Sequence, residues 1–463
     1  MKSWRDLPLP EVLVIHGGRV VDPASGRDEI ADVVVEEGVI RRVGPDAGEG
    51  YARRAAEDGG RSERNGATRP QGPIRVLDAR GLVVTPGLID MHVHLREPGQ
   101  EYKEDIASGT RAAARGGFTA VAAMPNTQPV IDTLPLVEFV RTQAERRGAA
   151  RVYPIGAVTK GSQGQELAPL GEMAEGGAAA FSDDGHPVAT AELMRLALLY
   201  AGQFGRTVID HCEEKSLTQG GSMHRGRVST LLGLRGMPSS GEDIAVARNL
   251  LLAEETGGRL HIAHLSTARS LGLVRQAKAR GVQVSCEVTP HHLVLTEEAL
   301  EQHRYDTNHK MSPPLRSAED VEALRRGLAD GTIDCIATDH APHHADDKEV
   351  PFAEAAFGIV GLETALGLVL TYLVQPGLVT LTRAVAALTV APARILGVPG
   401  GTLAEGAPGD VTIIDPDAVW TVDPTAFASR GRNTPFGGLQ LTGRAVHTVV
   451  GGRLVMANGQ LNV

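Results

Sequence analysis

Eight short apolar segments alternate with longer helical patterns between residues 83 and 339, and this alternation limits the folds open to the chain. The apolar segments are Val83–His94, Thr119–Asn126, Arg151–Val158, Ala178–Asp184, Arg206–Cys212, Arg259–Leu265, Val282–Val288 and Ile333–Asp339. Alternating strand and helix patterns predict parallel βα units. Eight units in one run predict an α/β protein with a (β/α)8 TIM-like barrel, whose functional side chains stand at the C-terminal ends of the strands.

The two ends of the chain contain short strand patterns separated by turns, in Val12–Val84 and again in Gly401–Val463. Because both ends share this pattern, we expect them to form one small β domain beside the barrel. The expected boundaries are 1–84 and 398–463 for the two parts of the β domain and 85–397 for the barrel.

Residues 46–73 interrupt the first β-rich segment with a sequence rich in Gly, Arg, Glu and Ala. This stretch has almost no aliphatic residues, so it cannot bury a core of its own. We expect a mobile insertion there, with a short exposed helix as the alternative.

Charge and cysteine content exclude several classes of protein. With 46 basic and 56 acidic residues the formal net charge is −10, which argues against nucleic acid or an anionic membrane as a partner. The most apolar stretch, 358–374, is interrupted by Glu363 and is too short to span a membrane. The three cysteines are far apart and the N-terminus has no apolar leader pattern, so we expect a cytoplasmic protein without disulfides.

Histidine and aspartate gather where the predicted strands end, while the strand bodies are apolar. His92 and His94 lie two residues apart and point to the same side of a strand, so both imidazoles can reach one ion. His211, His264 and Asp339 occupy the ends of three other predicted strands. Imidazole and carboxylate are suitable zinc ligands, and five or six of them at one barrel mouth suit two metal ions better than one.

A group that bridges two metals is harder to assign. The sequence has no lysine between Lys160 and Lys215, so the fourth predicted strand offers Asp183 and Asp184 in its place. Adjacent strand residues point to opposite faces, so at most one of the two aspartates faces the metals directly. The residues alone leave both open, with Lys160 as a weaker candidate.

Seven motifs occur in order between about Pro86 and Arg394: PGLIDMHVHLREPG, GGFTAVAAMPNT, FSDDG, DHCE, AHLST, EVTPHH and IATDHAPH. Together they resemble the bacterial class I dihydroorotases of the amidohydrolase superfamily. The resemblance implies two zinc ions, the first held by His92, His94, Asp184 and Asp339 and the second by Asp184, His211 and His264. It favours Asp184 over Asp183, and His264 over His261, which an odd spacing also places on the other strand face.

The resemblance also implies a substrate pocket. Arg96 would hold a substrate carboxylate, and the pocket would be completed by His94, Asn126, His343 and the backbone around Phe357–Gly358. Asp339 would be the catalytic base in ring opening and the acid in ring closure, and Asp90 would orient a ligand histidine. This chain departs from the family at Ser312, where Lys-Met-Asn-Pro-Pro-Leu is usual and an asparagine contacts the substrate.

The implied reaction is the reversible hydrolysis of the cyclic amide of (S)-dihydroorotate to N-carbamoyl-L-aspartate, in pyrimidine biosynthesis. The resemblance leaves open a homodimer and an association with an aspartate carbamoyltransferase. One alternative is a dihydropyrimidinase, hydantoinase or allantoinase, enzymes that usually carry a bridging lysine on the fourth strand. Another is a non-catalytic scaffold, but such homologues have typically lost metal ligands, and here every ligand position is filled.

Overall fold

The computed structural model describes residues 2–57 and 74–463, and its larger part is a barrel of eight parallel strands. In barrel order the strands are β6 (Leu88–Val93), β7 (Phe118–Ala123), β8 (Arg151–Gly156), β9 (Ala180–Ser182), β10 (Thr207–Asp210), β13 (Leu260–Ile262), β14 (Val284–Val288) and β15 (Cys335–Ile336). Beyond the strand ends, Val93 pairs with His340, and the His94 amide donates to the His340 carbonyl at 2.9 Å. These contacts nearly close the barrel, as the eightfold alternation predicts.

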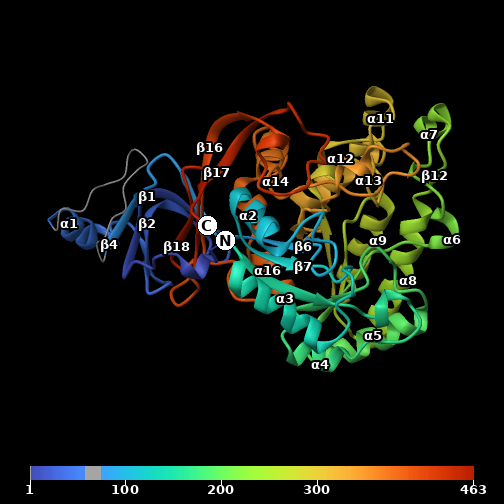
Figure 1. Ribbon diagram of the computed structural model, residues 1–463, viewed down its shortest axis with the longest axis horizontal. Coiled ribbons are helices and arrows are strands. Elements are labelled where there is room, and N and C mark those ends of the chain that lie inside the picture. Colours follow the sequence, from blue (N-terminus) through green and yellow to red (C-terminus); the bar gives the residue numbers. More distant parts are fainter. Residues whose placement is uncertain (1, 58–73) are drawn as a thin grey trace.

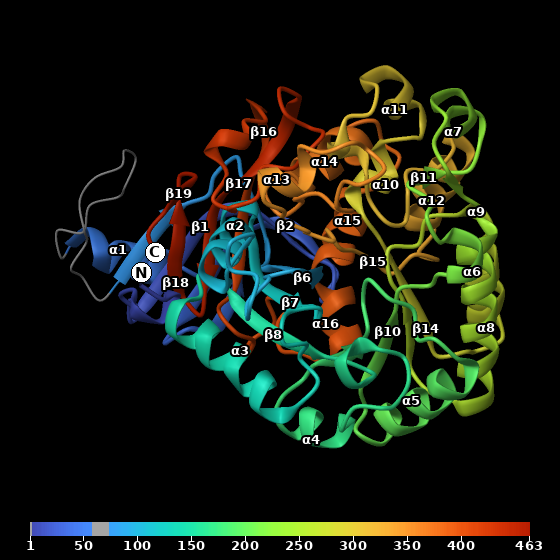
Figure 2. The same ribbon diagram turned by 45° about the vertical axis from the view of Figure 1, so that its right-hand side comes forward.

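Helices cover the outside of the barrel, with α5, α8, α9 and α12 packed in succession (Figure 2). The α-helices from residue 106 onward are α2 (Ile106–Gly116), α3 (Leu134–Arg147), α4 (Leu170–Glu175), α5 (Ala191–Gln203), α6 (Lys215–Thr218), α7 (Arg227–Leu232), α8 (Ser240–Thr256), α9 (Ala268–Ala279), α10 (Pro290–Val294), α11 (Glu298–His303), α12 (Ala318–Ala329), α13 (Ala345–Lys348), α14 (Ala365–Val369), α15 (Leu381–Leu388) and α16 (Val390–Leu396), and Leu370–Val374 forms a π-helical turn. Between α6 and α8, β11 (Met223–His224) and β12 (Gly236–Met237) form a separate two-stranded sheet.

Local sequence explains how α2 begins and ends. Asp105 caps its first turn by accepting from the Ser108 amide at 2.7 Å, and the Ser108 hydroxyl accepts from the Asp105 amide at 3.1 Å. Gly117 ends the helix with a φ of 92°, a left-handed conformation that glycine adopts without steric cost. The chain then turns directly into β7.

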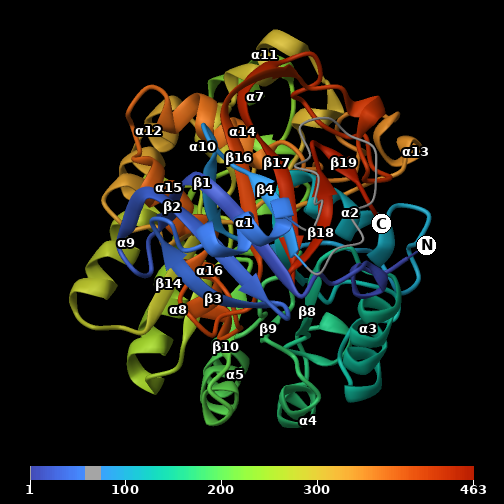
Figure 3. The ribbon, with the colours of Figure 1, turned by 90° about the vertical axis from the view of Figure 1, so that its left-hand side faces the viewer.

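A second sheet joins the two ends of the chain, in the order β19-β18-β17-β16-β5-β1-β2-β3, with β4 also paired to β1. Its strands are β1 (Val12–Asp22), β2 (Arg27–Glu36), β3 (Val39–Gly44), β4 (Ile74–Asp78), β5 (Val83–Pro86), β16 (Val411–Thr421), β17 (Gln440–Val450), β18 (Arg453–Ala457) and β19 (Gln460–Leu461). The junction is the antiparallel pair β5–β16, in which Val84 faces Ile413. Figures 1 and 3 show the blue and red ends side by side in this sheet, and α2 and α14 of the barrel pack against β17.

The apolar run Val83–His94, expected as one strand, is two strands that belong to different sheets: β5 lies in the second sheet and β6 in the barrel. The break falls at Gly87, whose amide donates to the Asp410 carbonyl at 2.9 Å. A Cβ at Gly87 would lie 2.1 Å from the Thr119 hydroxyl, so a larger residue would not fit at this crossing.

Part of the segment expected as a mobile insertion is helical. Residues Glu49–Glu57 form α1, so the alternative of a short helix holds for this part, and residues 58–73 lie outside the described chain. Tyr51 donates to the Glu36 carboxylate at 2.5 Å, and the Gly48 amide donates to Asp32 at 3.0 Å. These two hydrogen bonds tie the start of the segment to the second sheet.

The buried core is built mostly from Val, Leu, Ile and Ala, as the low aromatic content of 3% requires. One cluster fills the second sheet around Val33 and Ile413, and another lies inside the barrel around Met91 and Ile155. Within the described residues, none of the helices combines the length and the apolarity needed to cross a membrane.

Candidate active site

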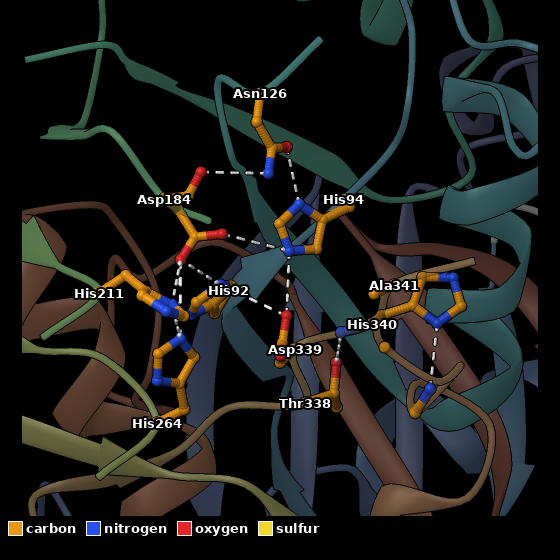
Figure 4. A network of polar contacts seen from close by, with 12 residues as sticks. His92, His94, Asn126, Asp184, His211, His264, Thr338, Asp339, His340 and Ala341 are labelled. Atoms are coloured by element: carbon orange, nitrogen blue, oxygen red, sulfur yellow. Dashed lines mark hydrogen bonds and ion pairs between the residues drawn. The ribbon is translucent and has the colours of Figure 1, made fainter. Parts of the chain in front are cut away.

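Four histidines and two aspartates from five strand ends meet at the C-terminal mouth of the barrel (Figure 4). His92 is in β6 and His94 follows it, and the other four side chains stand just beyond β9, β10, β13 and β15. The six residues are His92, His94, Asp184, His211, His264 and Asp339, and all are buried. The structure therefore brings together every side chain that the sequence analysis assigned to the metals.

Asp184 lies between two halves of this cluster. Its Oδ1 is 3.3 Å from His92 Nε2, 3.7 Å from His264 Nε2 and 3.9 Å from His211 Nδ1. Its Oδ2 is 3.5 Å from His94 Nε2, which in turn lies 3.0 Å from Asp339 Oδ1. A carboxylate with one oxygen toward each half has the shape of a bridging ligand.

Two overlapping groups of side chains offer ligand atoms close enough together to hold a metal ion: His92, Asp184 and His264, and His92, His94 and Asp339. His92 Nε2 and Asp184 Oδ1 are both buried, and neither has a hydrogen-bond partner within the described residues. Buried polar atoms are rarely unpartnered, and imidazole and carboxylate are ordinary ligands for zinc and related cations. The donor set fits a metal centre.

The carboxylates also set the charge of the cluster. Burial alone would raise the pKa of Asp339, but the His94 hydrogen bond and the neighbouring imidazoles outweigh it and lower the pKa. Burial would also raise the pKa of Asp184, but the neighbouring imidazoles, His92 foremost, lower that pKa well below its ordinary value. Both aspartates are therefore ionised at neutral pH.

Asp183 points away from this cluster, toward the loop after β8. Its carboxylate accepts from the backbone amides of Val158 at 2.9 Å and Thr159 at 3.0 Å, and from the Thr159 hydroxyl at 2.5 Å. The two adjacent aspartates thus have separate surroundings, with Asp183 holding a loop and Asp184 facing the histidines.

The outer nitrogens of three histidines meet polar partners that the sequence analysis did not assign to them. Glu287 accepts from His92 Nδ1 at 2.6 Å, and Asn126 Oδ1 accepts from His94 Nδ1 at 2.9 Å. Glu213 Oε2 lies 3.5 Å from His211 Nε2. Glu287 belongs to the motif EVTPHH and Glu213 to DHCE, so a signal was present, but the partners are distant in sequence.

Two expectations concern residues next to the cluster. Asp90 does contact a histidine of the cluster, but through the backbone: its carboxylate accepts from the amides of His92 and Thr338, each at 3.1 Å. The expectation for His261 is corrected. His261 is not on an opposite strand face from His264, because β13 ends at Ile262 and His264 adopts a left-handed φ of 31°. His261 Nε2 instead lies 3.1 Å from Glu287 Oε2.

A cavity of about 390 Å³ opens over the cluster, and the residues expected to contact substrate line it. They are His94, Arg96, Asn126, Ser312, His343, Phe357 and Gly358. Several already have partners: the Asn126 amide nitrogen donates to the Asp184 carbonyl at 3.2 Å, and His343 Nε2 donates to the Phe357 carbonyl at 2.9 Å. The segment from Glu213 to Gly221 lines the same cavity and was not predicted to do so.

The parallel barrel and the buried histidine–aspartate cluster at its C-terminal mouth define an amidohydrolase. A family model described as "Amidohydrolase family" matches residues 244–456, and one described as "Dihydro-orotase-like" matches residues 81–270. Relatives described as dihydroorotase include one from Pelotomaculum thermopropionicum, 56% identical over 96% of this chain and 98% of the relative, and one from Anaeromyxobacter sp. (strain K), 53% identical over 98% and 99%. The chain belongs to the dihydroorotase family.

Solved structures of related enzymes share the fold. An L-hydantoinase (dihydropyrimidinase) from Arthrobacter aurescens is 27% identical, with a TM-score of 0.84 over 98% of each chain. A D-hydantoinase (dihydropyrimidinase) from Thermus sp. is 26% identical, with a TM-score of 0.78 over 97% of this chain and 96% of the other. These identities are about half of those to the dihydroorotase relatives.

Proposed function

We propose that the chain is a dihydroorotase that reversibly hydrolyses the cyclic amide of (S)-dihydroorotate to N-carbamoyl-L-aspartate, a reaction of pyrimidine biosynthesis. Full-length similarity to proteins of that name supports the proposal. The observation that carries it at this site is a buried arginine, Arg96, in the wall of the cavity.

The guanidinium of Arg96 is buried beside the cluster, with 8% of the residue exposed, and it lines the cavity. Its Nε donates to the Pro342 carbonyl at 3.2 Å, and its Nη2 lies 3.4 Å from His343 Nε2. Among the described residues no carboxylate is hydrogen-bonded to it, and Asp339 and Asp184 attract it only from a greater distance. A bidentate carboxylate is the partner that guanidinium geometry suits best, so the arginine is available to a substrate carboxylate. Dihydroorotate carries a ring carboxylate, whereas dihydrouracil and hydantoin do not.

We propose two zinc ions per subunit, the first held by His92, His94, Asp184 and Asp339 and the second by Asp184, His211 and His264. The unpartnered His92 Nε2 and Asp184 Oδ1 support this assignment. Bound zinc would supply a water of lowered pKa and a Lewis acid for the amide carbonyl.

Asp339 is proposed as the group that moves the proton. Its ionised carboxylate can accept a proton from the attacking water and release it to the ring nitrogen as the C–N bond breaks. In ring closure the same carboxylate takes the proton from the carbamoyl nitrogen. His94, Asn126, Ser312, His343 and the Phe357–Gly358 backbone are proposed to contact the substrate from the cavity wall.

A substrate panel tests the function. Purified protein should hydrolyse dihydroorotate and be weak on dihydrouracil, hydantoin and allantoin. Arg96→Met should lower kcat/KM for dihydroorotate about 10- to 100-fold, because a hydrogen bond to a charged group is worth about 1.5–3 kcal/mol, and should spare the uncharged substrates. Equal losses on all four substrates, or a wild-type preference for hydantoin, would favour the hydantoinase alternative.

Asp339→Asn should reduce kcat by at least 100-fold, because the amide keeps the shape of the carboxylate but cannot accept the proton, and general base catalysis contributes about 10²–10⁴-fold. Zinc content, measured on the same preparation, should remain above that of His92→Ala. Full turnover in the Asn variant would assign the proton transfer to another residue.

Three further proposals depend on the resemblance: a cytoplasmic location, a homodimer, and an association with an aspartate carbamoyltransferase. Light scattering of the purified chain, alone and mixed with a carbamoyltransferase, tests the last two. A chain that is monomeric alone and does not bind the carbamoyltransferase would refute both.

A further inference from the structure

Beneath the histidine–aspartate cluster, four polar side chains form a continuous hydrogen-bonded series through the inside of the barrel. His92 Nδ1 lies 2.6 Å from Glu287 Oε1, and Glu287 Oε2 lies 3.1 Å from His261 Nε2. His261 Nδ1 lies 2.7 Å from the hydroxyl of Ser285. His92, His261 and Glu287 have no exposed surface, so solvent does not compete for these bonds.

The chemistry of Glu287 fixes the direction of the series. Its two oxygens are surrounded by nitrogen atoms: Oε1 faces His92 Nδ1 and accepts from the His264 amide at 3.3 Å, and Oε2 faces His261 Nε2. An ionised carboxylate only accepts hydrogen bonds, so His92 Nδ1 and His261 Nε2 must both carry hydrogens. A neutral His261 then accepts at Nδ1, and Ser285 donates to it. A neutral His92 has its lone pair at Nε2, facing Asp184 and Asp339.

His92 is the histidine of the cluster whose outer nitrogen lies within close hydrogen-bond distance of a carboxylate, that of Glu287. The outer nitrogen of His94 meets a neutral amide, that of His211 lies 3.5 Å from Glu213, and that of His264 has no hydrogen-bond partner among the described residues. His92 is also shared by the two groups of ligand atoms at the barrel mouth. In the proposed assignment it binds the first ion, so fixing its ring acts on that ion directly.

The far end of the series reaches the opposite end of the barrel. Ser285 is half-buried and lines a cavity of about 490 Å³ together with Thr207, Leu260 and Val284. These three residues begin β10, β13 and β14, so the cavity lies at the N-terminal ends of the strands. A change at Ser285 can thus be made far from the substrate cavity.

A rival interpretation is that His261, Glu287 and Cys335 hold an ion of their own, because their ligand atoms also lie close together. Both oxygens of Glu287 already accept from N–H donors, however, and both nitrogens of His261 already have partners. The geometry favours hydrogen bonding over coordination at this place.

We propose that Glu287, supported by His261 and Ser285, is a positioning residue that holds His92 in the tautomer and orientation required to bind a cation. The inference rests on the proposed zinc site and deepens it. A carboxylate behind a ligand histidine typically strengthens metal binding, and its loss costs about 10- to 100-fold in affinity.

The test is the zinc dissociation constant of each purified variant, measured by competition with a chromophoric chelator, alongside the melting temperature of the zinc-free protein. Glu287→Gln should weaken zinc binding about 10- to 100-fold, because its amide nitrogen would oppose one of the two imidazole N–H groups. Glu363→Gln is the matched control. Its buried carboxylate accepts from the backbone amides of Ala428 and Ser429 and has no contact with the cluster, so its zinc affinity should equal the wild type.

Ser285→Ala is the milder variant and decides the question if Glu287→Gln does not fold, because unchanged zinc affinity in Ser285→Ala would then overturn the inference. It should weaken zinc binding about two- to fivefold in the wild-type background, and should add no further loss to Glu287→Gln, because the effect passes through Glu287. Unchanged zinc affinity in a folded Glu287→Gln, or equal losses from Ser285→Ala in both backgrounds, would overturn the inference. Absence of zinc binding by the wild-type protein would overturn the proposed function itself.

Discussion

Three residues at the barrel mouth have a backbone conformation that L-amino acids rarely adopt. Arg96 has a φ of 60°, His264 of 31° and Asp339 of 49°. Left-handed conformations at non-glycine residues cost about 1–3 kcal/mol each and occur where the surrounding structure enforces them, often at functional sites. Each of these residues comes just after a barrel strand, so the turn directs its side chain back over the mouth.

Ser312 lines the cavity, at the position where the family resemblance predicted an asparagine. Asparagine at this position offers a donor and an acceptor where serine offers one hydroxyl. Ser312→Asn should raise kcat/KM for dihydroorotate by tenfold or less, or leave it unchanged, because one hydrogen bond is worth about 0.5–1.5 kcal/mol. Steady-state kinetics measure this. A fall of a hundredfold or more would mean that the pocket is adapted to serine and to another cyclic amide.

At the scale of elements, two buried lysines hold the loop that carries Phe357 and Gly358. The Lys348 ammonium donates to the carbonyls of Ala356 at 2.8 Å and Gly358 at 3.1 Å. Lys310 Nζ lies 4.4 Å from the centre of the Phe357 ring. The loop therefore owes its position to side chains from outside it, including one from the motif that contains Ser312.

Burial lowers the pKa of Lys348 from 10.5 to about 7. Between pH 7 and 10 the folded protein binds fewer protons than the unfolded chain at this group, so its contribution to the free energy of unfolding rises with pH. Lys348→Met lacks this contribution. Urea unfolding at pH 7 and pH 9.5 should show the wild type gaining stability relative to the variant as pH rises. Parallel pH dependences would contradict the assignment.

The segment 46–73 is the second element whose role can be tested. Its described part is tied to β2 by Tyr51 and Glu36, and α1 packs against β1 and β4 of the second sheet (Figure 1). Replacement by a short Gly/Ser linker should leave kcat nearly unchanged and lower the unfolding free energy by about 1–3 kcal/mol, because two hydrogen bonds are lost. Activity and urea unfolding of the same preparation measure this. A large loss of kcat would assign the segment a role in catalysis.

At the scale of the whole molecule, the proposed metal ligands come from five strand ends, so a bound cation would link most of the barrel. Ligands that bind the folded state alone stabilise it, by about 2.7 kcal/mol at a free concentration 100 times the dissociation constant. Chelation should therefore lower the melting temperature, and zinc should restore it, as differential scanning calorimetry can measure. An unchanged melting temperature would argue against a site assembled from these strands.

The two sheets of the molecule are joined directly along the chain, because β5 and β6 are separated only by Gly87. The expected boundary at 84/85 falls inside β5, which belongs to the second sheet as far as Pro86. We therefore propose that residues 87–397 form the barrel domain and that 1–86 and 398–463 form the β domain. Separate expression of 87–397 would test this division, with an insoluble product counting against an independently folding barrel.

The sequence by itself determined the barrel, its composite β partner and the side chains at its mouth. These features depend on local patterns: strand and helix periods repeat along the chain, and a residue at a strand end is recognisable from its neighbours. The HxH pair and the aspartate that follows β15, Asp339, were therefore visible before any contact was known.

Tertiary structure decided how those side chains are held. Glu287 and His92 are 195 residues apart, and His211 and His264 are 53 apart, so no local pattern couples them. The alternation rule failed at His261 because the strand ends before His264 and the backbone turns there. Hydrogen bonds across the inside of a barrel depend on which strands become neighbours and in what register, and these are set by the packing of the whole chain.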